Sequence, residues 1–270
     1  DASAGDVGDG GEIVVWSDVS NPDSLTRVEG QLWARAGSIS GDGGNLETSG
    51  YSLDVNNIST DASALNGSGS NGQWLIDPFN ITISGSVDQN ITQGTDTFTP
   101  IGSGASISPQ TIETALSTGN VIVQTTNPSG TDPGNILVAS NVTAPQGSGD
   151  LTLIADNNIE IQSGVALQNT AASGSLKLDA QNDIYIDGTI SWNPGPSGSV
   201  ELVAGSGGDI TGYGSGQLHV WDGDLIIDVH SNSTPSGFEG EIITDVGVNL
   251  IKNGAGEFLI APGFEWGAND

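Results

Sequence analysis

The chain of 270 residues contains no cysteine and no methionine, only two histidines, and only four lysine and arginine residues together. Without cysteine, neither a disulfide nor a thiolate metal site can form. No apolar run approaches the ~20 residues that a membrane-spanning helix needs. The sequence therefore predicts a protein that does not insert into a membrane.

The shortage of basic residues stands against 33 acidic ones, which gives a formal net charge of -29. Nucleic acids and anionic lipids are bound through clusters of lysine and arginine, so neither is an expected partner. A charge of this size keeps a chain soluble but strains its compact state by self-repulsion. We therefore expect a saline environment outside the cell.

What the chain has in abundance is glycine, with 41 residues, among many Ser, Thr, Asn and Asp. These residue types favour turns, each through its own backbone or side-chain geometry. The apolar residues are mostly Val, Ile and Leu, and strong helix formers are scarce. This composition predicts an all-β fold.

Residues 135–203 contain an internal repeat of short alternating strands. Leu151, Leu176 and Val200 are 25 and 24 residues apart, and Ile159 and Ile161 recur as Ile184 and Ile186. At the same offset, Val165 and Leu167 correspond to Ile190 and Trp192. Each copy thus carries three short strands whose alternate residues point inward.

A period in the low twenties with several very short strands is typical of a β-solenoid. Stacking each coil on the next would pair equivalent strands about 4.8 Å apart and align the inward aliphatic residues. Asn157, Asn158 and Asn182 fall between strands, where asparagine tolerates left-handed backbone. We therefore expect a parallel β-helix with these asparagines at its corners.

The pattern continues less regularly in both directions, which predicts a single β-helix domain over 1–270 with roughly ten coils. Residues 1–83 would form N-terminal coils, 84–120 an insert plus a helix, and 121–270 regular and then less regular coils. Within this division, 84–108 shows little alternation and is interpreted as an irregular insert. A short flanking helix is expected near 109–118, with Ser108 as N-cap, Pro109 in the first turn and Gly119 at its end.

Four segments occur in an order that resembles a known family, the filamentous-haemagglutinin-like exoproteins of two-partner secretion systems. They are Gly11-Glu-Ile-Val-Val-Trp-Ser-Asp18, Gly41-Asp-Gly-Gly-Asn-Leu-Glu-Thr-Ser-Gly50, Gly72-Gln-Trp-Leu-Ile-Asp-Pro-Phe-Asn-Ile-Thr-Ile83 and Ile107-Ser-Pro-Gln-Thr-Ile-Glu-Thr-Ala-Leu116. The resemblance covers most of residues 10–203 and becomes generic after about 205. It places the chain just after the family's secretion domain, which should precede residue 1.

The resemblance implies a right-handed parallel β-helix that is exported through a dedicated outer-membrane transporter partner and acts at the bacterial cell surface. It also implies roles in adhesion, aggregation, filament formation or biofilm, with host cells, glycans or further copies of the chain as partners. It carries over no catalytic residue and no cofactor, so the chain is expected not to be an enzyme.

Because a fold does not decide a function, a carbohydrate-active β-helix enzyme or a sugar-binding module remains the alternative. A polysaccharide lyase needs a strong base beside acidic calcium ligands, and only Arg27, Arg35, Lys177 and Lys252 are available. A glycosidase needs two carboxylates at a set separation. Two acidic groups could supply such a pair, although solvated surface positions explain them better: Asp179, Asp183 and Asp187, and Asp222, Asp224 and Asp228.

Candidate calcium ligands are Asp6, Asp9 and Asp42, which lie in turn-forming acidic segments and offer the oxygen atoms that this hard cation prefers. They do not match the calcium-binding nonapeptide repeat, so diffuse cation binding is the stronger expectation. Asn-x-Ser/Thr triplets, which could accept glycans, begin at six positions: Asn57, Asn66, Asn80, Asn90, Asn141 and Asn232.

The two histidines, His219 and His230, form no metal-binding motif and are interpreted as surface or partly packed residues. Most tryptophans alternate with aliphatic residues and are expected in the core or at coil ends: Trp16, Trp33, Trp74, Trp192 and Trp266. Trp221, beside His219 and Asp222, is retained as a candidate surface contact.

Overall fold

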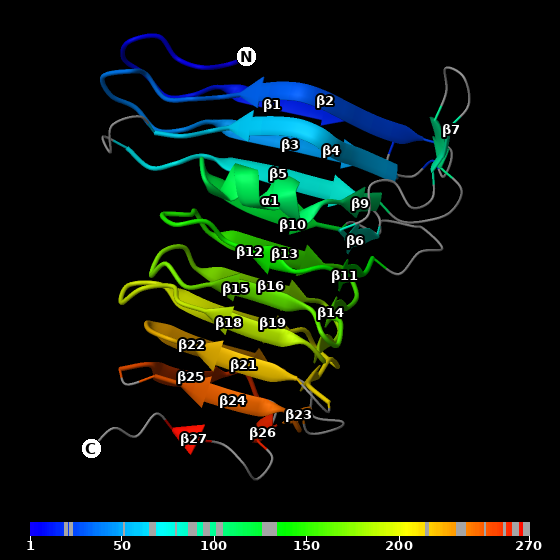
Figure 1. Ribbon diagram of the computed structural model, residues 1–270, viewed down its shortest axis with the longest axis vertical. Helices are drawn as coiled ribbons and strands as arrows, with labels where there is room; N and C mark the ends of the chain where they lie inside the picture. Colours follow the sequence, from blue (N-terminus) through cyan, green and yellow to red (C-terminus); the bar gives the residue numbers. More distant parts are fainter. Residues whose placement is uncertain are drawn as a thin grey trace. The chain divides into compact units, whose positions relative to one another are not determined.

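A computed structural model shows an all-β chain whose parallel sheets form a solenoid of about seven turns, with a single short helix in the part of the chain that it describes (Figure 1). It describes residues 1–18, 21, 24–50, 52–64, 69–78, 80–85, 91–93, 98–100, 105–125, 134–213, 216–230, 236–245, 247–255, 258–260 and 265–266. The expected parallel β-helix is confirmed. The described residues form two compact units, 1–134 and 135–270.

Unit 1 contains two parallel sheets. The first sheet joins β1 (Glu12–Trp16), β3 (Asn45–Gly50), β5 (Gln73–Pro78) and β10 (Asn120–Gln124) in that order. The second joins β2 (Leu25–Trp33), β4 (Ser52–Asp61), β9 (Ala105–Ile107) and β6 (Ile81–Ile83). Because successive strands of each sheet pair in parallel, each pairing joins one coil to another.

The expected insert leaves the second sheet after β6 and returns to it at β9, which lies between β4 and β6. Its described residues include an antiparallel pair, β7 (Ile91–Gln93) and β8 (Phe98–Pro100), which stands apart from the two sheets (Figure 1). Residues 105–107 of the expected insert thus belong to the solenoid. Ile107 is fully buried there.

The predicted helix is α1 (Pro109–Leu116), and its N-cap is Ser108, whose hydroxyl accepts a hydrogen bond from the Thr111 backbone N–H at 3.2 Å. Its apolar face is buried and packs against β4 and β10. The helix ends earlier than expected, because Ser117, not Gly119, is the C-cap. The Ser117 hydroxyl donates to the Thr114 carbonyl and so satisfies a carbonyl of the last helical turn, as a glycine cap would otherwise do through the backbone.

Unit 2 contains three parallel sheets and a further strand pair. The first sheet joins β13 (Leu151–Ala155), β16 (Leu176–Ala180), β19 (Ser199–Ala204), β22 (Asp224–Val229) and β25 (Asn249–Asn253). The second joins β11 (Ile136–Val138), β14 (Ile159–Ile161), β17 (Ile184–Ile186) and β20 (Ile210–Thr211). The third joins β12 (Val142–Thr143), β15 (Ala166–Asn169), β18 (Thr189–Trp192), β21 (Gln217–Val220), β24 (Glu241–Thr244) and β27 (Glu265–Trp266). The further pair is β23 (Ser236–Phe238) with β26 (Phe258–Ile260).

The core of unit 2 consists of aliphatic side chains that repeat in register from coil to coil. In the first sheet Leu151 pairs with Leu176, which pairs with Val200, as the repeat predicts. In the second sheet Ile159 pairs with Ile184 and Ile161 with Ile186, also as predicted. All of these side chains are 0% exposed. Burial of such rows is the main favourable contribution to folding.

The register predicted for the third sheet was wrong by two residues. Leu167 pairs with Ile190, and Asn169 pairs with Trp192, so the offset here is 23 residues and not 25. Residues 162–165 connect β14 to β15, whereas only Asp187 and Gly188 connect β17 to β18. A corner that is shorter by two residues shifts the register by two, which keeps the same side chains pointing inward.

Candidate functional site

The corner before the second sheet of unit 2 is built from side-chain amides and carboxylates that bond to the next coil. The Asn135 side-chain oxygen accepts from the Asn158 backbone N–H at 3.1 Å, and Asn158 does the same for Asp183 at 3.0 Å. Asp183 in turn accepts from the Asp209 backbone N–H at 2.9 Å. Asn157 and Asn182 add amide bonds between the coils, to Asn135 and Asn158. The predicted corner asparagines therefore stabilise the stacking, which is a structural role.

Tyr185 extends this corner and has a perturbed pKa. Its hydroxyl donates to the second carboxylate oxygen of Asp183 at 2.6 Å. Loss of the phenolic proton would break this bond and place two negative charges together. This hydrogen bond, with a smaller effect of burial and of the Asp183 charge, raises the pKa of Tyr185 to about 12. The hydroxyl is therefore a hydrogen-bond donor at physiological pH and not a base.

The four basic side chains all have partners within the chain. Arg27 lies 2.9 Å from Glu29 and 3.3 Å from Asp54. Lys252 donates to the backbone carbonyls of three residues: Val229, Asn253 and Gly254. An anionic ligand would therefore have to compete with existing contacts for every cation that the chain has.

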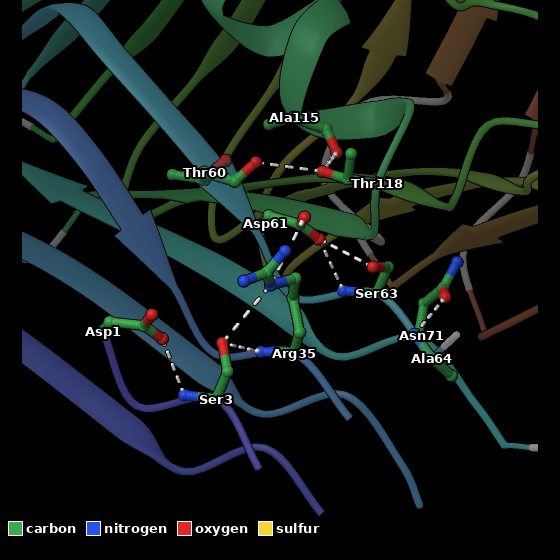
Figure 2. A network of polar contacts seen from close by, with 10 residues as sticks. All are labelled: Asp1, Ser3, Arg35, Thr60, Asp61, Ser63, Ala64, Asn71, Ala115 and Thr118. Atoms are coloured by element: carbon green, nitrogen blue, oxygen red, sulfur yellow. Dashed lines mark hydrogen bonds and ion pairs between the residues drawn. The ribbon is translucent and has the colours of Figure 1, made fainter. Parts of the chain in front are cut away.

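Arg35 is the centre of a polar network in unit 1 (Figure 2). Its backbone N–H and its Nε both donate to the Ser3 hydroxyl, at 3.1 and 3.4 Å, and its Nε lies 3.9 Å from the Asp61 carboxylate. The guanidinium also lies over the ring of Trp33, 4.3 Å from its centroid. Asp61 is further bonded to Ser63. Together these contacts link the first residues to two later coils.

Lys177 is the residue that best resembles a lyase base, because it lies between two carboxylates on the outer face of β16 and β19. Its Nζ is 3.1 Å from Asp179 and 3.7 Å from Glu201. Partial burial disfavours the charged form, but the hydrogen bonds and charges of Asp179 and Glu201 outweigh it and raise the pKa of Lys177. A lysine base at neutral pH needs a lowered pKa. The geometry is therefore that of an ion-paired surface lysine.

The two acidic groups are not brought together as catalytic pairs. Asp179 lies on the first sheet beside Lys177, whereas Asp183 precedes the second sheet and Asp187 follows its strand β17. The Asp187 carboxylate accepts from the Tyr213 backbone N–H at 3.2 Å. Each of these three acids thus bonds to a different part of the coil.

In the second group, Asp224 and Asp228 share the outer face of β22 but are four residues apart, or about 13 Å along an extended strand. Glycosidase carboxylates are separated by about 5–9.5 Å. The Asp224 carboxylate accepts from the Asn249 amide at 2.9 Å, and Asp228 lies 3.3 Å from His230. Asp222, between β21 and β22, accepts from the adjacent Gly223 N–H.

The candidate calcium ligands are exposed and bond to neighbouring backbone or hydroxyl groups. Asp9 accepts from the Asp42 backbone N–H at 2.9 Å, Asp42 accepts from Ser70 N–H at 2.8 Å, and Asp6 faces the Ser38 hydroxyl at 3.3 Å. Among the residues that the structure describes, no three His, Asp or Glu side chains are grouped so that they could hold a metal ion. Calcium binding at these aspartates stays a prediction.

The six glycosylation candidates differ in what can be said of them. Asn141 is exposed, and its side-chain oxygen accepts from the Ala166 backbone N–H at 2.9 Å. Asn80 is half-buried next to β6. Asn66, Asn90 and Asn232 lie outside the described residues, as does the side chain of Asn57. Glycosylation stays a prediction for all six.

The tryptophans divide into core and surface residues. Trp74 and Trp192 are buried as predicted, and Nε1 of Trp192 donates to the Gly174 carbonyl at 2.8 Å. Trp16 lies at the end of β1, the edge strand of its sheet, and not in the core: it is 68% exposed, because Ile13 and Val15 are the inward residues of β1. The side chain of Trp266 lies outside the described residues.

Trp221 lies at the centre of a surface cluster on the third sheet of unit 2. The other members of the cluster are Ser191, His219 and Asp245. The Trp221 and His219 rings stack with centroids 4.3 Å apart and planes 24° apart. The indole Nε1 donates to the Ser191 hydroxyl at 3.1 Å, and His219 Nε2 lies 3.0 Å from the Asp245 carboxylate. We call these four residues the Trp221 cluster.

The strand pairing explains how the Trp221 cluster forms. Ser191 and His219 are register partners on β18 and β21, and Trp221 follows His219 by two residues, on the same face. The sequence indicated Trp221 and His219 but not Ser191 and Asp245, which come from neighbouring coils. Only the offset between coils could have identified these two, and that offset was predicted incorrectly for this sheet.

Neither the protein-family models nor the curated proteins compared with this chain match it. No helix among the described residues is long and apolar enough to cross a membrane.

Proposed function

We propose that this chain is a structural and adhesive segment of a secreted bacterial surface protein that mediates attachment, aggregation or filament formation. The observation that carries the proposal is the in-register stacking of coils in each unit, with buried aliphatic rows and polar corner ladders. Such stacking makes a long surface from local contacts and displays outward residues at regular intervals.

The resemblance to filamentous-haemagglutinin-like exoproteins supports the same proposal through its four ordered segments. Three of them contribute strands to the first sheet of unit 1, namely β1, β3 and β5, and the fourth spans α1. On this basis we propose that the protein is exported through an outer-membrane transporter partner. A transporter gene of that class beside the coding gene would support this route, and a gene context without one would count against it.

The adhesive role can be tested with the full chain coupled to beads. We expect these beads to aggregate or to attach to bacterial or host-cell surfaces more than beads carrying an unrelated protein of similar negative charge. That control matters because a charge of -29 by itself changes how beads associate. Equal behaviour of the two kinds of bead would contradict the adhesive proposal.

A carbohydrate-active module is the second candidate, and the exposed Trp221 cluster is the observation that favours it. Binding is the better supported form of this candidate, because Lys177 has a raised pKa and the carboxylates of β22 are too far apart for a glycosidase pair. Incubation with acidic polysaccharides should release no reducing or unsaturated ends. Sustained turnover would instead favour an enzyme.

A further inference from the structure

We infer that the Trp221 cluster is a binding site for neutral saccharides. This inference deepens the proposed adhesive function and rests on it, because it names the ligand class that one surface of unit 2 would hold. The chemistry is stacking of the apolar face of a sugar ring on the indole, together with hydrogen bonds to polar groups beside it.

Trp221 has an exposed aromatic surface. The residue is 38% exposed although one face of its ring is stacked on His219. A ligand could contact the exposed part of the indole that His219 leaves uncovered. Exposed indoles offer a large apolar plane with one polar group, a combination suited to ligands with one apolar and one hydrated side.

The indole is held in place before any ligand arrives. Its Nε1 is fixed by the Ser191 hydroxyl, and the His219 ring beneath it is fixed by Asp245. The backbone is fixed as well, because the Trp221 N–H donates to the Trp192 carbonyl of the preceding coil at 3.1 Å. Binding would therefore lose little side-chain conformational entropy, and that loss is one of the main free-energy costs of binding at a surface.

The groups beside the indole are polar. The Asp245 side chain, which contacts the stacked His219 ring, is 45% exposed, and the Ser191 hydroxyl accepts from the indole Nε1. Carboxylate oxygens accept hydrogen bonds from sugar hydroxyls. The surroundings therefore suit a hydroxylated ligand better than an apolar peptide.

The charged groups beside the indole are negative. Asp222 follows Trp221 in the chain and Asp245 contacts the stacked His219 ring, whereas the four basic side chains make their contacts elsewhere. Uronic and sialic acids would be repelled by these carboxylates and by the net charge of -29. The ligand class is therefore neutral.

The test is a binding titration of the full chain by calorimetry against neutral gluco-, galacto-, manno- and N-acetylhexosamine oligosaccharides, with uronic-acid oligosaccharides as the charged counterparts. We expect at least one neutral oligosaccharide to bind and the charged ones not to bind. Trp221→Ala should weaken that binding about tenfold or more, equivalent to about 1.4 kcal/mol, since the aromatic plane that the sugar ring stacks on is lost. Trp221→Phe should retain part of the affinity.

Trp16→Ala is the matched control, because Trp16 is the more exposed tryptophan and lies in unit 1. It should leave the affinity unchanged. No binding of any neutral oligosaccharide, preference for charged ones, binding of an apolar peptide alone, or equal losses from both alanine variants would overturn the inference. If the chain attaches beads to cells but binds no neutral saccharide, the saccharide site is overturned and the adhesive function stands. If the chain binds a neutral saccharide but does not attach beads, the saccharide site stands and the adhesive function is overturned.

Discussion

Trp192 and Trp221 lie on neighbouring coils of unit 2 and have opposite environments. Trp192 is 0% exposed and fills the interior of the third sheet, whereas Trp221 lies on its outer face. Trp192→Ala should lower the free energy of unfolding by about 3–5 kcal/mol, because removing the buried indole leaves a cavity and leaves the Gly174 carbonyl without its hydrogen-bond donor. Trp221→Ala should change it by about 0.5 kcal/mol or less. Urea unfolding of the two variants measures both, and equal losses would show that the inward and outward faces are assigned wrongly.

Asn158 tests the corner ladder at the same scale. Its side-chain oxygen accepts from both the Asp183 backbone N–H and the Asn182 amide. Asn158→Ala should cost about 1–3 kcal/mol of stability, because partly buried donors would lose their acceptor. Asn141→Ala is the control, since its single bond to Ala166 lies at an exposed site and should matter less. An Asn158 variant as stable as the control would argue against a structural ladder.

Tyr185 makes the stability depend on pH in the alkaline range. Its pKa is raised to about 12 in the folded chain, and an unfolded tyrosine titrates near its ordinary value of about 10. The folded state thus holds the proton more tightly, so this contribution is complete below pH about 10 and is lost as the pH rises through about 12. Tyr185→Phe should flatten stability against pH in this window, as measured by denaturant unfolding. A wild-type profile that matches the variant's would contradict the raised pKa.

At the scale of elements, neighbouring coils of unit 1 approach one another closely at glycines. A Cβ on Gly72 would lie 1.9 Å from the Gly44 carbonyl oxygen, and one on Gly44 would lie 2.0 Å from that of Gly11. Gly72→Ala should therefore force the coils apart and cost about 1–3 kcal/mol or more. Gly5→Ala is the control, because a Cβ there meets nothing within 4 Å. Thermal unfolding compares the two, and equal melting temperatures would contradict the close stacking.

The strands and the helix could be predicted from the sequence wherever local pattern determines them. Alternation identified β13, β14, β16 and β17 with their pairing, and Ser108 with Pro109 identified the start of α1. Pattern could not fix the lengths of corners, so the third sheet was placed two residues out of register. It also could not show that β9 lies between β4 and β6, because that order depends on pairing across the insert and not on local residues.

The candidate site was less accessible to prediction than the fold. Trp221 and His219 stand two residues apart in the sequence, whereas Ser191 and Asp245 join them only through the stacking of coils. Trp16 shows the opposite difficulty, because a strand with apolar residues on both faces gives no clear alternation. Side chains that function on a solenoid are assembled from several coils, and their identification needs the register of every corner.

At the scale of the whole molecule, the net charge of -29 should make stability depend on ionic strength. Screening weakens repulsion among exposed carboxylates, and the screening length falls from roughly 10 Å at 0.1 M to about 3 Å at 1 M salt. The melting temperature should therefore rise with sodium chloride over this range. Calcium and magnesium chlorides at equal ionic strength separate general screening from specific binding at Asp6, Asp9 or Asp42. A melting temperature that falls as salt is added would contradict the role assigned to self-repulsion.

The parallel stacking of coils in register is the central claim, and engineered cysteine pairs in this cysteine-free chain test it most directly. Ala166 and Thr189 are register partners on the outer faces of β15 and β18, so their Cα atoms should be about 5 Å apart, within the range of a disulfide. Ala166 and Ser191, which the 25-residue offset would have paired, should be about 8 Å apart and outside it. On mild oxidation, Ala166→Cys with Thr189→Cys should lose its free thiols without forming dimers, and Ala166→Cys with Ser191→Cys should keep them. Equal cross-linking of the two pairs, or cross-linking of the second pair alone, would contradict the stacking described here.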